Sequence, residues 1–149
     1  QYEISNFSKP NFFSKHNTIY WKSDNWIGVG PGAISRIWNN KKDRIEFENF
    51  KKPETWLKNC LNEKVNLKKI FKINFDITQQ EILMMGLRLN EGINLSKLRH
   101  KTFLNHQEIK QLQRQNIIYI KKNNLRINEN YFNVHDYIVR KIIDNYEFS

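Results

Sequence analysis

An imidazole, an amide and two large aromatic rings lie close together in the run His16-Asn17-Thr18-Ile19-Tyr20-Trp21. Imidazole is a common axial ligand of haem iron, and aromatic rings can pack on a porphyrin plane. The same side chains can also line a solvated cleft, because a single histidine is more often an ordinary hydrogen-bonded residue than a metal ligand. The spacing by itself therefore leaves a ligand role and a structural role open.

Closely spaced glycines follow a short apolar run, in the sequence Gly28-Val29-Gly30-Pro31-Gly32-Ala33. Glycine lacks a Cβ atom, so the backbone can turn sharply or approach a ligand there. The pattern also fits the G-x-G-x-x-G/A fingerprint of dinucleotide-binding proteins, which needs a helix directly after the loop. Residues 34–43 are too short and too polar for such a helix, so a Rossmann site is not expected. A ligand-contacting loop and a plain tight turn both remain.

Cys60 is the one cysteine of the chain. Iron–sulfur clusters need several thiolates on one scaffold, so we expect no cluster and no three- or four-cysteine metal site here. The lone thiol also excludes an intrachain disulfide, which suits a reducing cytoplasm. The remaining histidines, His100, His106 and His135, lack metal-ligand spacing. No nucleophile elbow, phosphate loop or catalytic triad pattern is present, and we expect no catalytic residue.

The 149 residues carry a formal net charge of +10. A basic surface attracts nucleic acids, acidic membranes or anionic ligands. The charge is dispersed, however, and no block of lysine or arginine is longer than two residues. We therefore attribute it to a general richness in lysine and asparagine and expect no nucleic-acid partner. No apolar run reaches the roughly 18 residues of a membrane span, so no transmembrane segment is expected.

The first half reads as strands and loops with one short helix. Alternation predicts a strand over Tyr2–Phe7, and an apolar run predicts another over Trp26–Val29. Residues 12–21 are rich in aromatic side chains and ambiguous between helix and strand. Pro53 is typical of a first helical turn, and apolar residues follow it at helical spacing as far as Leu61.

The second half has the signals of a compact helical domain. The run Thr78-Gln79-Gln80-Glu81 is a capping box that predicts a helix start, and Gly92 is expected to end that helix. The run Asn105-His106-Gln107-Glu108 predicts the start of a second helix, which Asn116 can end, and a hairpin is expected over residues 117–127. A last helix carries Val134, Ile138, Ile142 and Tyr146 on one face. Helix, helix, hairpin and helix predict a winged-helix-like module, with a domain boundary near Asp76.

Several motifs together resemble the later part of the HemW/HemN-like radical-SAM family. They are Tyr2–Phe7, the pattern His16-Asn17-x-x-Tyr20-Trp21, and Ile27–Ala33. The helical half is similar to the C-terminal domain that the HemW and HemN branches share, in Leu87-Arg88-Leu89-x-x-Gly92-Ile93, Phe103 and Leu125-Arg126-Ile127. The resemblance covers essentially the whole chain, and HNxxYW combined with GxGxGA at this separation is specific to it.

The resemblance implies an α+β fold. Residues 1–76 would form the C-terminal edge of a radical-SAM partial (β/α) barrel with the glycine loop and a linker. Residues 77–149 would form the HemN-type winged-helix-like domain. In such proteins the segment aligned with the glycine loop contacts S-adenosylmethionine, which implies Gly30, Gly32, Ala33 and Ile34 as cofactor-binding residues.

The pattern HNxxYW typifies the HemW branch of the family, where it is associated with haem binding. The resemblance therefore implies His16 as the haem ligand, with Tyr20 and Trp21 near the macrocycle. The HemN branch lacks this motif, so haem binding and trafficking rank above oxidative decarboxylation of coproporphyrinogen III. A nucleic-acid-binding winged helix is a weaker alternative, in which a recognition helix would present Gln107, Lys110, Gln111 and Arg114.

The complete proteins of this family carry a CxxxCxxC loop with a 4Fe–4S cluster and use S-adenosylmethionine. This chain lacks those cysteines and begins without an initiator methionine, so we expect it to be a C-terminal part that is not active alone. Its implied partners are haem or porphyrin, the N-terminal radical-SAM half and haem-accepting proteins. The sequence also departs from the family near the start of the last helix, where Asn128, Asn130 and Tyr131 replace the usual threonine and glycine.

Overall fold

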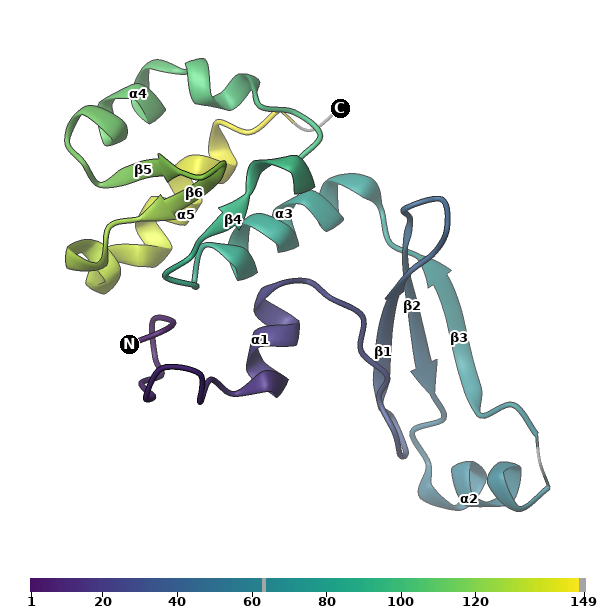
Figure 1. Cartoon of the computed structure of the whole chain (residues 1–149). Helices are drawn as coiled ribbons and strands as arrows, with labels where there is room; N and C mark the ends of the chain where they lie inside the picture. Colours follow the sequence, from purple (N-terminus) through teal and green to yellow (C-terminus); the bar gives the residue numbers. More distant parts are fainter. Residues whose placement is uncertain (63, 148–149) are drawn as a thin grey trace. The chain divides into compact units, whose positions relative to one another are not determined.

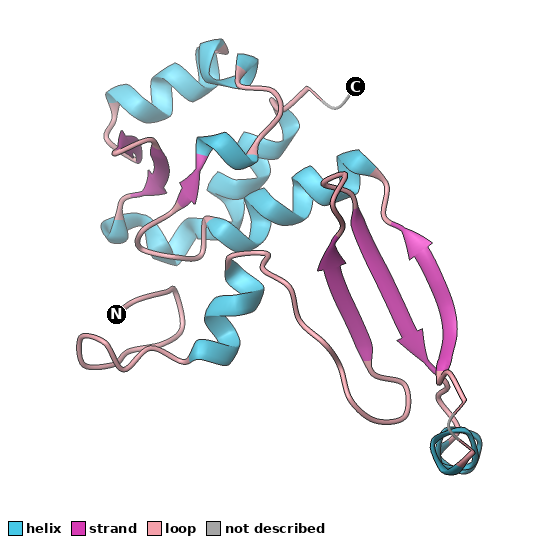
Figure 2. Cartoon of the chain, turned by 45° about the vertical axis from the view of Figure 1, so that its right-hand side comes forward, coloured by secondary structure: helices cyan, strands magenta, loops and turns pink. Residues whose placement is uncertain are grey.

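The computed structural model describes residues 1–62 and 64–147, which form two compact units (Figure 1). The first unit combines Gln1–Ser23 with Gln79–Ser149, and the second is Asp24–Thr78. Within the described residues there are five α-helices and two three-stranded sheets, both antiparallel (Figure 2). The fold is therefore a mixture of helices and small sheets, as the sequence predicts.

The second unit is built on a sheet of consecutive strands. Its strands are β1 (Ile34–Trp38), β2 (Arg44–Asn49) and β3 (Leu67–Lys72), in the order β1-β2-β3. Helix α2 (Pro53–Leu61) connects β2 to β3 and has proline in its first turn, as predicted. Strands of a (β/α) barrel are parallel and alternate with helices. This antiparallel sheet thus does not confirm the expected end of a barrel.

The strand expected over Trp26–Val29 is wrong. Only Trp26 pairs, in an isolated bridge with Arg36, and regular pairing begins after the glycine loop at Ile34. The physical reason is the turn of residues 30–33, which lets β1 rather than the preceding segment pair with β2. Strand β1 follows the glycines, at the place where the Rossmann fingerprint needs a helix.

Polar groups occupy much of the interior of the second unit. The Arg44 side chain is 3% exposed and lies between the rings of Trp26 and Trp38, at 4.8 and 4.9 Å from their centroids. Beside it, Arg36 and Glu46 form an ion pair at 2.6 Å. Among the buried hydrophobic side chains of the described residues, only Ile73 belongs to this unit. Cation–π and ionic contacts therefore replace most of an apolar core here.

The first unit is mainly helical. Its helices are α1 (Lys15–Trp21), α3 (Phe75–Gly86, which begins in the second unit), α4 (Gln107–Arg114) and α5 (His135–Asp144), with short 3₁₀ helices at Leu95–Lys97, Thr102–Asn105 and Glu129–Val134. Strands β4 (Ile93–Asn94), β5 (Ile118–Lys121) and β6 (Asn124–Ile127) form its sheet in the order β4-β6-β5. The core includes Leu83, Leu87, Phe103, Ile109, Ile118, Leu125, Ile138 and Ile142, each at most 2% exposed.

Two of the predicted helix signals are misplaced. Helix α3 begins at Phe75 rather than after Thr78, because the Asn74 side chain accepts the Asp76 backbone N–H at 2.7 Å one turn earlier. Helix α3 also ends at Gly86, well before the expected stop at Gly92, although Gly92 does have the left-handed backbone, with φ of 66°.

The hairpin lies where the sequence predicts it, but the last helix is shorter than expected: α5 is His135–Asp144, so Val134 lies before it and is 43% exposed. Strands β5 and β6 pair around Lys122 and Asn123, and Ile138 and Ile142 are buried on α5. Asn116 adopts the left-handed conformation just after α4, with φ of 54°. The order helix, helix, hairpin, helix is thus present, and its description as a winged helix stays a prediction.

The N-terminal segment packs with the helical unit. The strand expected over Tyr2–Phe7 is wrong: Glu3 forms only isolated bridges, with Asn6 and Leu89. The backbone N–H of Asn90 donates to the Tyr2 carbonyl at 3.1 Å, which joins the start of the chain to the residues after α3. Residues 1–23 and 24–78 therefore lie in different units. The domain boundary near Asp76 stays a prediction, and residues 148–149 of its second segment lie outside the described residues.

Candidate functional site

Helix α1 presents His16 and Tyr20 on one face. The helix starts after Ser14, whose side chain accepts the Asn17 backbone N–H at 3.3 Å. His16 is exposed, and the Tyr20 ring stands edge-on to it at 4.9 Å, because residues four apart are neighbours on a helix. Among the described residues none hydrogen-bonds to the His16 ring. One of its nitrogens is therefore available to a ligand.

Trp21 lies on a different face of α1 from His16. Its ring packs against Arg88, whose guanidinium carbon is 4.6 Å from the ring centroid. The Trp21 Nε1 atom is buried without a hydrogen-bond partner. The structure thus brings together two of the three predicted haem residues, His16 and Tyr20, and places the third against the body of the unit.

Exposed phenylalanine rings lie just before α1 in the chain. Phe12 is 75% exposed and Phe13 is 48% exposed, and Phe13 stacks on Tyr2 at 4.8 Å. Phe7 is equally exposed, at 75%. Exposed rings of this kind are unusual on a surface that only meets water and are typical of a ligand or partner surface. His16 therefore follows directly on an aromatic segment.

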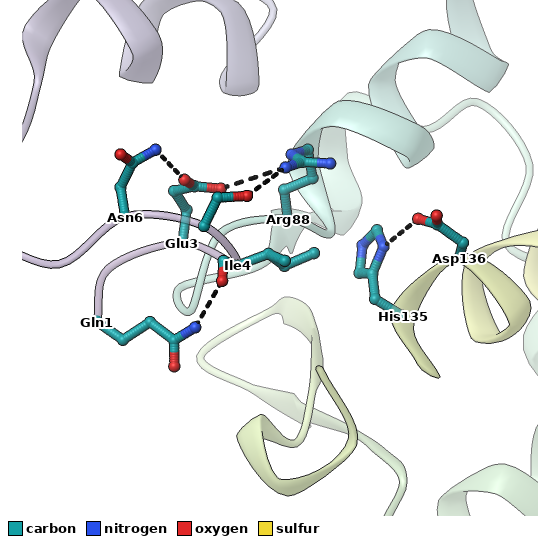
Figure 3. Close-up of polar contacts among 8 residues, drawn as sticks. Gln1, Glu3, Ile4, Asn6, Arg88, His135 and Asp136 are labelled. Carbon is teal, nitrogen blue, oxygen red and sulfur yellow. Dashed lines mark hydrogen bonds and ion pairs between the residues drawn. The ribbon is translucent and has the colours of Figure 1, made fainter. Parts of the chain in front are cut away.

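A buried ion pair fixes the N-terminal segment on the unit. Glu3 is fully buried, accepts a hydrogen bond from Asn6, and lies 3.6 Å from the Arg88 guanidinium (Figure 3). Arg88 also donates to the Ser5 hydroxyl at 3.1 Å. The sequence analysis missed Glu3 and Arg88 as functional supports. The available signal was a charged residue inside each of two motifs, Glu3 in Tyr2–Phe7 and Arg88 between Leu87 and Leu89.

The glycine loop is a tight turn pinned to β2. Gly30 and Gly32 have φ of 110° and 70°, and the Ala33 N–H donates back to the Gly30 carbonyl at 3.3 Å. The Asn49 side chain donates to the same carbonyl at 2.9 Å. These backbone angles favour glycine, because a Cβ is strained against the following carbonyl oxygen in the left-handed region.

One side of this turn is open. A Cβ atom added to Gly30 would meet nothing within 4 Å, and Ile34 is 46% exposed. The nearby Ile27 and Val29 side chains are also exposed. The four predicted cofactor residues, Gly30, Gly32, Ala33 and Ile34, are consecutive or nearly so. We call them the glycine ledge, and exposed apolar side chains lie beside it.

A charged pair, Glu48 of β2 and Lys51 just after that strand, lies next to the glycine turn. Lys51 lies 3.1 Å from Glu48, and its hydrogen bond lowers the pKa of the Glu48 carboxyl. Glu48 is paired across the sheet with Ile34. The carboxylate next to the ledge is therefore ionised at neutral pH and already has a partner.

The residues of this chain do not fit a 4Fe–4S cluster. Cys60 is exposed, and the amide of Asn66 lies 2.8 Å from its sulfur. No group of three or more possible metal-ligating side chains occurs within residues 1–62 and 64–147.

None of the helices in the described residues has the length and hydropathy needed to cross a bilayer.

Comparison with known proteins defines the class of this chain. Residues 80–130 match the HemN C-terminal domain family. This segment runs from α3 to the 3₁₀ helix before α5 and contains the whole sheet β4-β6-β5. Residues 80–130 therefore resemble a HemN C-terminal domain.

The relatives of the whole chain are radical-SAM proteins. The chain is 34% identical to "Radical S-adenosyl methionine domain-containing protein 1, mitochondrial" of Dictyostelium discoideum, over 96% of this chain and 37% of that protein. It is 27% identical to the haem chaperone HemW of Lactococcus lactis, over 99% of this chain and 38% of that protein. The chain is thus similar to HemW- and HemN-like radical-SAM proteins and spans less than two fifths of these relatives.

A solved structure of coproporphyrinogen III oxidase (HemN) from Escherichia coli, described as a radical SAM enzyme, also aligns with the chain. The TM-score is 0.47 at 14% identity, over 81% of this chain and 28% of that one. Bacterial and mitochondrial proteins both occur among the relatives, so the cytoplasmic location stays a prediction.

Proposed function

We propose that this chain forms the C-terminal portion of a HemW-like radical-SAM protein that binds and delivers haem. The observation that carries the proposal is His16, an exposed imidazole with no hydrogen-bond partner among the described residues, which stands beside Tyr20 at the end of an aromatic segment. The printed name of the HemW relative, a haem chaperone, supports the same function.

In this proposal each residue of the motif has a distinct task. A nitrogen of His16 binds the haem iron as an axial ligand, and the Tyr20 ring limits how the imidazole turns. The exposed Phe12 ring covers part of the macrocycle and excludes water from it. Trp21 acts indirectly, because its packing on Arg88 holds α1 in place.

The glycine ledge has a separate task in the complete protein. We propose that Gly30, Gly32, Ala33 and Ile34 form one wall of the S-adenosylmethionine site, with the exposed Ile34 side chain against the adenine. The chain supplies this wall but no thiolates for the cluster, so radical chemistry requires the N-terminal radical-SAM half. Oxidative decarboxylation of coproporphyrinogen III is the alternative reaction for such a complete protein.

A nucleic-acid-binding role is the weaker alternative. The four side chains that would read DNA from α4, Gln107, Lys110, Gln111 and Arg114, are all exposed. A polar outer face is also what any solvated helix presents. A salt titration with duplex DNA separates the two functions, because binding through phosphates weakens steeply with ionic strength.

The haem proposal is tested by replacing His16 with alanine. We expect haem affinity to fall by about tenfold or more and the Soret band to shift, because the axial nitrogen is lost. His106→Ala is the matched control, since its imidazole is also partly exposed but lies at the start of α4. Absorbance titrations of both variants with haem measure the difference. Equal spectra and affinities in wild type and His16→Ala would make His16 a structural residue.

A further inference from the structure

Arg126 carries a charge for which the described residues offer no partner. It lies on β6, the central strand of its sheet, directly opposite Tyr119 of β5. Its Nε atom is buried and has no hydrogen-bond partner. Within residues 1–62 and 64–147 no carboxylate pairs with its guanidinium. Buried donors in proteins are nearly always satisfied, so an unsatisfied arginine indicates a missing acceptor.

Two cavities meet at this arginine. One has a volume of about 360 Å³ and is lined mostly by apolar surface, including Tyr2, Phe13 and Leu89. The other has a volume of about 450 Å³ and is mostly polar, with Tyr119 and Asn128 in its wall. Arg126 therefore lies at the junction between an apolar and a polar cavity, both within the first unit.

Asn90 is a second unsatisfied group at the same junction. It lines both cavities, and its Oδ1 atom is buried without a partner. Its Nδ2 atom donates to the Gln1 carbonyl at 2.6 Å, which fixes Oδ1 as the free acceptor. A buried donor and a buried acceptor are thus left for something that enters the cavities.

The position of Arg126 is built into the backbone. Gly92 packs against β6 so closely that an added Cβ would lie 2.0 Å from the Leu125 carbonyl oxygen and 2.8 Å from Cγ of Arg126. Only glycine leaves room there for the arginine stem. Gly92 and Arg126 therefore act together. The space left by the glycine sets the direction from which a ligand reaches the guanidinium of Arg126.

The nearby acids do not occupy this guanidinium. Glu91 lines the apolar cavity but forms an ion pair with Lys22 at 2.8 Å. Glu129 lines the polar cavity and makes no ion pair with Arg126 among the described residues. An external anion can therefore reach the arginine without displacing an internal one.

We propose that Arg126 anchors a binding site for a small aromatic carboxylate. The carboxylate oxygens accept hydrogen bonds from the guanidinium, and the aromatic body enters the cavity beside Tyr2, Phe13 and Leu89. Arginine suits this task because its planar fork matches the two oxygens of a carboxylate. Ligand cavities cover about 300–1,000 Å³, so the apolar cavity suits a molecule of one or two rings. This site does not depend on haem binding at His16.

The probe for this site is 2-naphthoate, with its neutral amide and inorganic phosphate as reference ligands. Isothermal titration of the 149-residue chain should show binding of naphthoate and clearly weaker binding of the amide and of phosphate. Arg126→Gln removes the charge but keeps a polar side chain on an unbranched stem, and it should weaken naphthoate binding by about tenfold or more. Arg126→Lys should retain part of the affinity. Arg140→Gln is the control, since the Arg140 side chain is 82% exposed on α5, and it should bind like wild type.

Thermal unfolding of each variant shows whether the first unit remains folded. Equal naphthoate affinity in wild type and a folded Arg126→Gln variant would overturn the proposal. Phosphate that binds as tightly as naphthoate would also overturn it, because the apolar cavity would then contribute nothing. Coproporphyrin presents carboxylates on a much larger ring and should not compete with naphthoate. If coproporphyrin competes with naphthoate, the site binds a porphyrin carboxylate rather than a small aromatic carboxylate, and the proposal is refuted.

Discussion

Glu3 is the most enclosed charged side chain of the first unit, and its environment shows why single residues matter here. A carboxylate that loses water must recover hydrogen bonds and opposite charge inside the protein. Asn6 and Arg88 provide them, and Arg88 in turn lies over the Trp21 ring. Contacts thus connect Glu3 of the N-terminal segment to Arg88, which follows α3, and Arg88 to Trp21 of α1. We expect the stability of α1, the helix that carries His16, to depend on these contacts.

Replacing Arg88 with alanine should therefore destabilise the first unit strongly. We expect a loss of about 3 kcal/mol in the free energy of unfolding, because an uncompensated carboxylate stays buried. Arg140→Ala is the control, as Arg140 lies 4.0 Å from Asp144 on the exposed face of α5 and should cost less than about 0.5 kcal/mol. Denaturant unfolding measures both. Adding Glu3→Gln to Arg88→Ala should recover part of the loss, and equal costs for the two arginines would contradict this account.

At the scale of elements, the turn of the hairpin β5–β6 places a lysine in the left-handed region. Both central residues, Lys122 and Asn123, are left-handed, with φ of 50° and 63°. Such a turn matches the twist of the strands but favours asparagine and glycine. Asn123 offsets its strain by donating to the Asn94 and Ser96 side chains, each at 3.1 Å. Lys122 carries strain without such a bond among the described contacts.

Lys122→Gly should accordingly stabilise the hairpin. We expect a gain of about 0.5–1 kcal/mol, because a left-handed lysine costs more than the extra entropy of glycine in the unfolded chain. Lys121→Gly tests the neighbouring strand position, where glycine should instead cost about 0.5–1 kcal/mol. The melting temperatures of the two variants should move in opposite directions. A loss of stability in both would show that the turn is not strained.

At the scale of the whole molecule, the two units differ in how they are stabilised. The apolar core lies almost entirely in the first unit, whereas the second relies on sheet pairing, the Arg44 stack and the Arg36–Glu46 pair. Burial of apolar surface is the main source of folding free energy. The second unit also exposes large apolar side chains, including Ile27, Val29 and Ile70.

The rate of amide hydrogen exchange should therefore differ between the two units. We expect slow exchange around Leu83, Leu87, Ile138 and Ile142, whose side chains are buried in the core of the first unit. Amides of β1, β2 and β3 should exchange faster, since local opening of that unit exposes little apolar surface. Mass spectrometry of peptides from the exchanged chain measures both. Uniform protection across the two units would contradict this division.

The sequence by itself determined the features that depend on local chemistry. Proline placed the start of α2, the apolar stripe of the last helix placed Ile138 and Ile142 in the core, and the polar turn residues placed the β5–β6 hairpin. The motifs also identified the family. These signals act within a few residues of one another, so neighbouring side chains and turn preferences are sufficient to produce them.

Only the tertiary structure decided how the segments combine. Residues 2–7 alternate like a strand, yet their backbone pairs with residues 88–90 through single bonds, because those are the groups that the fold brings to them. The structure likewise separated Trp21 from His16 and left the guanidinium of Arg126 unpaired between two cavities. Such contacts join residues far apart in the chain, and sequence spacing carries no information about them. Their geometry follows only when the core has closed around them.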